Sequence, residues 1–159
     1  MSRRVALLAF VSLFVTAAHA ADVEVQSPWV RGTVEGQKAS GAFMTLTSAK
    51  GATLVGASVS KKIAGVTEVH EMKMDGDRML MRAIPRLELP AGKPVALARG
   101  GYHIMLMDLK QPLKPGSSID IELKIENAAK KIETVKVKAA VRDLTDNGGS
   151  RHEHHGHHH

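Results

Sequence analysis

The chain has 159 residues, of which eight are methionine and none is cysteine, and its formal net charge is +6. The lack of cysteine excludes disulfide bonds and thiolate metal sites. Three Phe, one Tyr and one Trp supply little stacking surface, and the basic residues form no stripe. Nucleic-acid binding is therefore not expected.

The first twenty residues have the three-part pattern of a secretory signal peptide. Arg3 and Arg4 form a basic start, residues 5–17 are almost entirely apolar, and residues 18–20 read Ala-His-Ala, a small-x-small cleavage site. The apolar run is too short to span a bilayer stably, although an uncleaved anchor is the alternative. We expect residues 1–20 to be removed on export, leaving a soluble mature protein with 20 basic against 16 acidic residues.

Residues 21–144 are predicted to form one β-rich domain. Ile119, Ile121, Leu123 and Ile125 alternate with polar or charged residues, and shorter stretches at 23–25, 42–47, 52–60 and 135–138 have a similar strand-like pattern. Gly, Pro, Asn and Asp separate these stretches, and residues 128–131 fit a hairpin loop better than a turn of helix. This period of two predicts an all-β, antiparallel sandwich or barrel.

A polar linker at residues 145–150 precedes a histidine-rich end. The pattern predicts a flexible tail over 145–159 that binds metal, an engineered purification tag being the alternative. The candidate tail ligands are His152, His154, His155, His157, His158 and His159.

Two short segments gather six of the methionines and both histidines that lie between the leader and the tail. In the first, Asp75-Gly76 is a hairpin signal that would place His70 opposite Met81 and Met72 opposite Met79. Because side chains alternate along a strand, any even-length loop leaves His70 and the hairpin methionines on one face. In the second, His103, Met105 and Met107 share one face, while Ile104 and Leu106 supply the core from the other.

This gathering of thioethers and imidazoles suits a soft metal ion. Methionine is also a good filler of irregular cores, so Met72, Met74, Met79 and Met107 are either packing residues or secondary ligands. Cu(I) prefers thioether and imidazole donors, whereas Zn(II) favours Cys, His and carboxylate, and hard cations need oxygen clusters. The sequence therefore predicts a Cu(I) site.

The spacing of these residues resembles the H-x10-M-x21-H-x-M signature of periplasmic copper chaperones of the PCu(A)C family. His70, Met81, His103 and Met105 match all four positions, and the text around residues 29–31, 41–44, 69–72 and 100–103 is also similar. The resemblance implies a cupredoxin-like Greek-key β-sandwich and Cu(I) held by those four residues. It also implies copper delivery in the periplasm toward a haem-copper oxidase, often beside a thioredoxin-like partner, and a tail associated with Cu(II).

The competing functions differ in how well they fit. A blue-copper centre needs a Cys thiolate and is excluded, and no signature of a hydrolase, metalloprotease or nucleotide-binding enzyme is present, so we expect a monomeric carrier that is not an enzyme. A copper-storage or copper-resistance protein without a dedicated acceptor needs the same ligands as a chaperone. The sequence leaves that alternative open.

Overall fold

The computed structural model describes residues 22–143 and residue 145, so the predicted signal peptide and the histidine-rich end of the tail lie outside the described residues. Within them no helix is long and apolar enough to cross a bilayer. The described part of the chain forms ten strands: β1 (Val23–Arg31), β2 (Ala39–Ser48), β3 (Ala52–Val59), β4 (Ala64–Asp75), β5 (Arg78–Ala83), β6 (Leu87–Leu89), β7 (Pro94–Leu97), β8 (His103–Leu109), β9 (Ser118–Asn127) and β10 (Ile132–Arg142).

The strands form one hydrogen-bonded path in the order β5-β4-β8-β2-β1-β10-β9-β3-β6, and β7 pairs with β2. Every pairing along this path is antiparallel except that of β1 with β10, which run parallel. The expectation of a purely antiparallel sandwich was wrong at this one place. The first and last strands meet there, and nearly the whole described chain forms the connection that a parallel pair requires.

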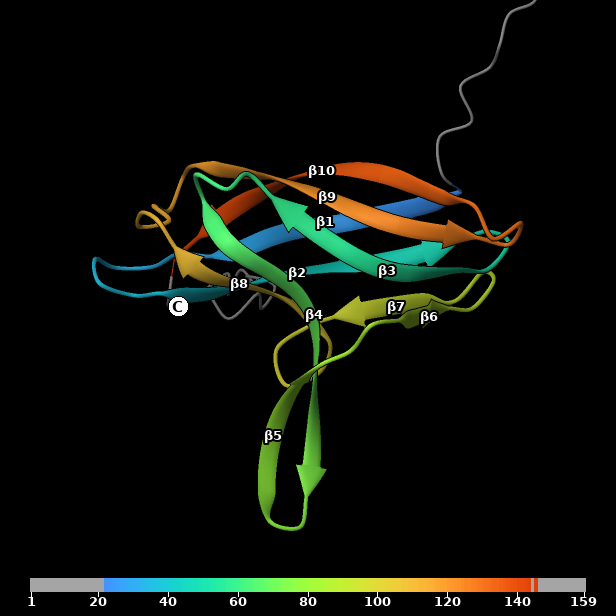
Figure 1. The fold of residues 1–159 in the computed structure, drawn as a ribbon, viewed down its shortest axis with the longest axis horizontal. Helices are drawn as coiled ribbons and strands as arrows, with labels where there is room; N and C mark the ends of the chain where they lie inside the picture. The colour runs from blue at the N-terminus through green and yellow to red at the C-terminus, as the bar shows by residue number, and fades with distance from the viewer. Residues whose placement is uncertain (1–21, 144, 146–159) are drawn as a thin grey trace, which may run out of the picture.

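The path folds over on itself into two layers around a single core, and Figure 1 shows β9 and β10 lying over β2 and β8. Val69 of β4, Leu106 of β8 and Leu123 of β9 belong to the same buried cluster, although the three strands come from both halves of the path. Burial of such aliphatic side chains is the main force that holds the layers together. The predicted all-β sandwich is confirmed.

β9 and β10 form the most regular part of the sandwich. The inward residues of β9 are at most 6% exposed, and its outward residues up to Lys124 are exposed. The predicted loop at 128–131 is a hairpin, in which the Asn127 side chain accepts hydrogen bonds from the backbone N–H groups of Ala129 and Lys131. An Asn side chain that closes a turn in this way is a common local device.

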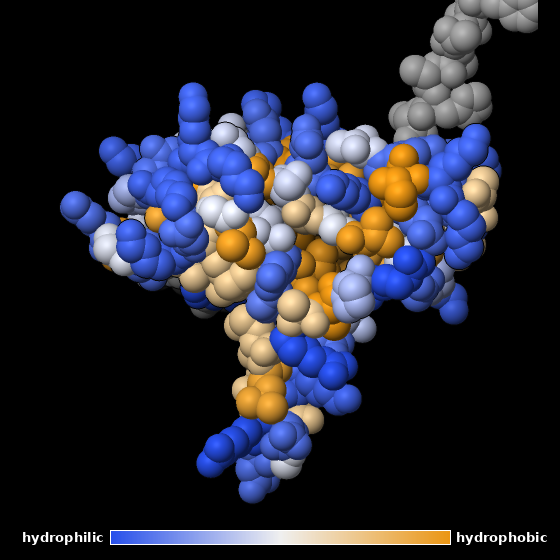
Figure 2. Space-filling view, in the orientation of Figure 1, coloured by the Kyte–Doolittle hydropathy of each residue, from blue (hydrophilic) through white to orange (hydrophobic). Residues whose placement is uncertain are grey.

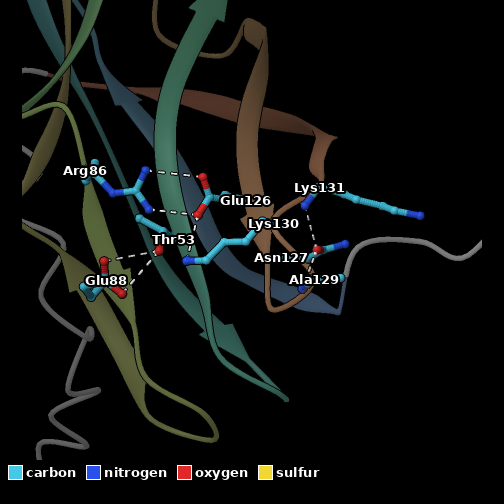
Figure 3. A network of polar contacts seen from close by, with 8 residues as sticks. All are labelled: Thr53, Arg86, Glu88, Glu126, Asn127, Ala129, Lys130 and Lys131. Atoms are coloured by element: carbon cyan, nitrogen blue, oxygen red, sulfur yellow. Dashed lines mark hydrogen bonds and ion pairs between the residues drawn. The ribbon is translucent and has the colours of Figure 1, made fainter.

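Polar side chains link the outer strands β9, β3 and β6, as Figure 3 shows. Arg86, just before β6, donates to Glu126 of β9 at 2.9 Å, and Lys130 donates to the same carboxylate. Thr53 of β3 donates to Glu88 of β6. Hydrogen bonds from Arg86 and Lys130, together with their positive charges, hold the pKa of Glu126 below its ordinary value. This network joins the edge strand β6 to its neighbours β3 and β9.

β4 extends beyond the sandwich with β5 as a projecting two-stranded arm, at the bottom of Figure 1. Met74 pairs with Met79, Met72 with Met81 and His70 with Ala83, so the loop is Gly76-Asp77. The predicted loop at Asp75-Gly76 was therefore one place early. Gly76 has a φ of +60° as the first loop residue, as a type II′ turn requires. The loop still has two residues, so the methionines share one face as predicted.

Candidate metal site

The outward face of β8 carries the second histidine-methionine segment. Ile104 and Leu106 are fully buried in the core. Because side chains alternate along the strand, His103, Met105 and Met107 point to the opposite face. The sequence prediction that Ile104 and Leu106 would serve the core is confirmed, and a chemical role for the other face stays a prediction.

Strand pairing lines up the outward residues of β4, β8 and β2 in rows. His70 of β4 pairs directly with His103 of β8. In the next row Met105 lies between Glu68 of β4 and Gly41 of β2. On the arm side of His70, Met72 pairs with Met81 of β5. Two segments about thirty residues apart in sequence therefore place His and Met side by side on one surface.

A pocket of about 270 Å³ opens on this surface. Its lining residues are Arg31, Ser40, Gly41, Phe43, Met72, Met81, Arg99, Gly100, His103 and Met105. Three of the four predicted ligands, Met81, His103 and Met105, thus share one pocket, and Met72 joins them. His70 is not in the lining, but its ring centroid lies 5.7 Å from that of His103.

Each histidine has one ring nitrogen held by a neighbour, and no partner is recorded for the other among the described residues. His70 Nε2 is 2.8 Å from Glu68 Oε2, while His70 Nδ1 is buried without a partner. His103 Nδ1 is 3.1 Å from the Gly101 carbonyl oxygen. A carbonyl can only accept, so the proton sits on His103 Nδ1 and leaves Nε2 as an acceptor. Metal-binding histidines are oriented in this way, with the second nitrogen donating to a carboxylate or carbonyl.

Burial keeps His103 neutral over a wider range of pH. Removal from water lowers the pKa of its imidazole below the ordinary value of 6.5, and the neighbouring His70 lowers it further, against the Gly101 carbonyl, which raises it. A metal ion binds the neutral ring, so this environment favours the ligand form of His103.

Aromatic and small residues support the back of the pocket. The Phe43 ring lies 6.3 Å from the His103 ring and 4.6 Å from the Trp29 ring. A side chain at Gly41 would bring its Cβ within 2.9 Å of the Phe43 ring, so glycine is required for the ring to lie there. Neither Phe43 nor Glu68 was among the predicted site residues. The alternation of side chains along a strand could have identified Glu68, because it lies two residues before His70 and therefore on the same face.

The pocket lining contains two arginines and no carboxylate. Arg31 has a buried Nε for which the described part of the chain offers no hydrogen-bond partner, and the Arg99 guanidinium stacks over the Trp29 ring at 5.6 Å. Arg142 stacks on the same ring at 5.3 Å. Positive charge beside the pocket disfavours hard multivalent cations, which need anionic oxygen ligands.

The four predicted secondary methionines occupy different places. Met72 lines the pocket. Met74 and Met79 lie further out on the arm and are more than half exposed. Met107 shares the face of Met105 but pairs with Val66 and is absent from the pocket lining. The histidines of the predicted tail site lie outside the described residues.

The donors gathered here are therefore sulfur and imidazole nitrogen. In the part of the chain that the structure describes, no group of three or more His, Asp and Glu side chains could hold a metal ion. Thioethers are the soft donors that share the pocket lining with His103. Soft monovalent ions accept such donors, whereas hard cations and Zn(II) do not favour them.

The chain is similar to proteins of one family. The LpqE-like family model, described as "Putative lipoprotein LpqE-like", matches residues 23–141. A curated relative from Leifsonia xyli subsp. xyli, "Putative lipoprotein Lxx21020", is 33% identical over 117 residues, which are 73% of this chain and 69% of the relative.

Solved structures show the same likeness. Apo-DR1885 from Deinococcus radiodurans is 31% identical, with a TM-score of 0.59 over 90% of this chain and 94% of DR1885. DR1885 has also been solved in its CuI form, to which this chain is 30% identical, with a TM-score of 0.56 over 83% of this chain and 87% of that one. The copper-bound PCuAC domain from PmoF2 is 22% identical, with a TM-score of 0.59 over 77% of this chain and 93% of the domain, and supports the fold alone.

These likenesses confirm two expectations, namely the cupredoxin-like all-β fold and a protein that is not an enzyme. The family model covers most of the chain, and a solved relative above 30% identity covers nine-tenths of it. The chain belongs to the PCuAC/LpqE-like family.

Proposed function

We propose that the protein is an exported, periplasmic copper carrier that holds Cu(I) with His70, Met81, His103 and Met105. One observation carries this proposal: among the described residues, each histidine is held by a neighbour through one ring nitrogen, has no hydrogen-bond partner on the other, and shares its face of the sheet with thioether side chains. The CuI form of DR1885, about 30% identical to this chain, supports the choice of metal.

The chemistry of the site suits a carrier. Thioethers are neutral and lose no proton on binding, so only the histidines make binding depend on pH. Cu(I) is soft and accepts both donor types. Met81 is 47% exposed, so an acceptor protein can reach the ion through it. An accessible site with uncharged sulfur ligands favours release over permanent storage.

The acceptor follows from the resemblance in sequence. The full H-x10-M-x21-H-x-M spacing supports delivery toward the copper centre of a haem-copper oxidase, either directly or through a thioredoxin-like copper chaperone. The leader-like residues 1–20 support export to the periplasm. The histidines of residues 152–159 would capture Cu(II), which imidazole binds well. Storage or resistance without a dedicated acceptor is the alternative.

The test is Cu(I) titration of the exported chain against a competing Cu(I) chelator. The parent protein should bind one Cu(I) tightly, and the variant His70→Ala/Met81→Ala/His103→Ala/Met105→Ala should not. Met44→Leu is a matched control, because Met44 is a methionine on the inward face and only 3% exposed. Equal binding by the parent and the fourfold variant would refute the site.

Two further measurements test delivery to an acceptor and Cu(II) binding by the tail. Transfer of Cu(I) to an apo fragment of the oxidase copper subunit or to a thioredoxin-like chaperone would support delivery, and tight binding without transfer would favour storage. A chain ending at residue 144 should bind fewer Cu(II) ions than the whole protein. An unchanged number of bound Cu(II) ions would show that the tail does not bind Cu(II).

A further inference from the structure

A second pair of methionines lies on the arm beyond the pocket. Met74 of β4 and Met79 of β5 are direct cross-strand partners, one step from the Gly76-Asp77 loop. They are 56% and 53% exposed. The proposed Cu(I) site uses neither of them.

Packing does not explain these two side chains. The arm stands clear of the sandwich, and every residue of β5 is exposed. Figure 2 shows apolar residues running down the arm between hydrophilic ones. Methionine usually serves to fill gaps in a core, but no core lies here. The other face of the arm has the composition expected of a solvated strand, including an ion pair between Glu71 and Arg82.

The arm holds the two thioethers opposite each other. Its strands are paired from His70–Ala83 to Asp75–Arg78, and a two-residue turn closes them. Directly opposed side chains have Cβ atoms about 4.5–5.5 Å apart. Methionine has three rotatable bonds, so both sulfurs can turn toward an ion between them. Two neutral sulfurs suit a soft monovalent ion and offer nothing to a hard cation.

The outer pair continues directly into the pocket. Met72 and Met81 are the next cross-strand pair toward the sandwich on the same face, and both line the pocket with His103 and Met105. An ion at Met74 and Met79 therefore has a thioether pair as its next neighbour. The face offers soft donors in steps of two residues, from Met74 through Met72 to His70 on β4 and from Met79 to Met81 on β5.

We propose that Met74 and Met79 form a second soft-metal site, which loads Cu(I) onto the arm before it reaches the pocket. The loading role rests on the proposed function, whereas binding at the pair does not. Movement inward is ligand exchange: a bond from copper to a Met72 or Met81 sulfur forms as one to Met74 or Met79 breaks. No electron or proton moves, because copper stays Cu(I) and every sulfur is neutral.

The experiment is a titration of the exported chain, labelled with ¹³C at the methionine methyl groups, with Ag(I) as a probe that keeps one oxidation state. The methyl signals of Met81 and Met105 should shift with the first equivalent bound on this surface. Those of Met74 and Met79 should shift with the next. Met44, buried in the core, should not move at any ratio.

The outcomes separate the two proposals. If Met81 and Met105 respond and Met74 and Met79 never do, the arm site is refuted and the proposed function stands. If only Met74 and Met79 respond, the arm site stands and the pocket is refuted. If no methionine responds, both are refuted.

A matched variant tests whether the cross-strand pair itself is the site. Met74→Leu/Met79→Leu should lose the later step and keep the response of Met81 and Met105. Met79→Leu/Leu80→Met keeps the number of thioethers but moves one to the other face of the arm, and Met74 should then lose its response. If Met74 still shifts as in the parent, the pair is not the site. Both variants change only exposed residues, and an unchanged response at Met81 reports an intact fold.

Discussion

β8 and β9 are built alike on one face and differently on the other. Ile104 and Leu106 of β8 and Ile121 and Leu123 of β9 are all fully buried. From Asp120 on, the outward residues of β9 are charged, including Glu122 and Lys124, whereas the outward residues of β8 include His103, Met105 and Met107. The inward faces do the same work in the core, and only the outward faces distinguish the two strands.

The difference between the outward faces separates positions that the fold requires from positions that it leaves free. A strand needs only one apolar face to fold, and outward positions are ordinarily filled with charged residues that keep the surface soluble. β9 follows that rule. β8 carries imidazole and thioether side chains at such positions, and β4 carries them beside the Glu68 carboxylate, so this face is the candidate metal site. Inward substitutions should therefore cost stability in both strands, and outward ones should affect metal binding only around β8.

The largest effect is expected from the inward faces. Leu106→Ala and Ile121→Ala should each lower the free energy of unfolding by about 2–5 kcal/mol, because each removes a fully buried aliphatic side chain and leaves a cavity. Urea denaturation measures both. A small loss for Leu106→Ala beside a full loss for Ile121→Ala would show that the two inward faces are not equivalent.

The second-largest effect is expected on Cu(I) affinity at the outward face near β8. Glu68→Gln should weaken Cu(I) binding about 10–100-fold, because the Glu68 carboxylate orients His70 through the 2.8 Å contact with Nε2. Competition with a Cu(I) chelator measures the change. Glu122→Gln, an outward carboxylate on β9, is the matched control and should leave the affinity unchanged. Equal effects of the two variants would mean that Glu68 acts only through its charge.

A smaller effect tests the aromatic support of the pocket. Gly41→Ala should lower the free energy of unfolding by about 1–3 kcal/mol, because its Cβ would lie 2.9 Å from the Phe43 ring, which must move. Since Phe43 lines the pocket, Cu(I) affinity should fall as well. Gly56→Ala, beside β9, is the control, because its Cβ would meet Lys124 at an ordinary 3.7 Å. Thermal unfolding and chelator competition read out both variants.

Much of this arrangement could be predicted from the sequence, because period-two alternation is local. It assigns Ile104, Leu106 and the β9 aliphatics to the core and His103 and Met105 to the opposite face. The exact register of the arm could not be predicted, since Asp75-Gly76 and Gly76-Asp77 are both acceptable two-residue turns. The parallel pairing of β1 with β10 depends on contacts between the chain's distant ends, which no local pattern encodes. Gly41 and Phe43 are two residues apart on β2, so alternation places them on one face, but it does not show that the Phe43 ring lies against Gly41.

The smallest effect is the dependence on pH. Burial lowers the pKa of His103 below 6.5, so its imidazole is neutral and ready to bind at pH 7. Its contribution to Cu(I) affinity should be constant above pH 6.5 and should weaken only below the lowered pKa, by at most about one decade per pH unit, as the proton competes with copper.

The same shift predicts the sign of a stability change. Below pH 6.5 the unfolded chain protonates His103 while the folded chain does not, so the free energy of unfolding decreases as the pH is lowered. Once the pH is below the pKa of His103 in the folded chain, this group causes no further change. His103→Gln should remove that part of the slope from urea denaturation between pH 7 and pH 5. An identical slope in the variant would show that burial of His103 does not shift its titration, and would remove the reason to regard the ring as prepared for metal.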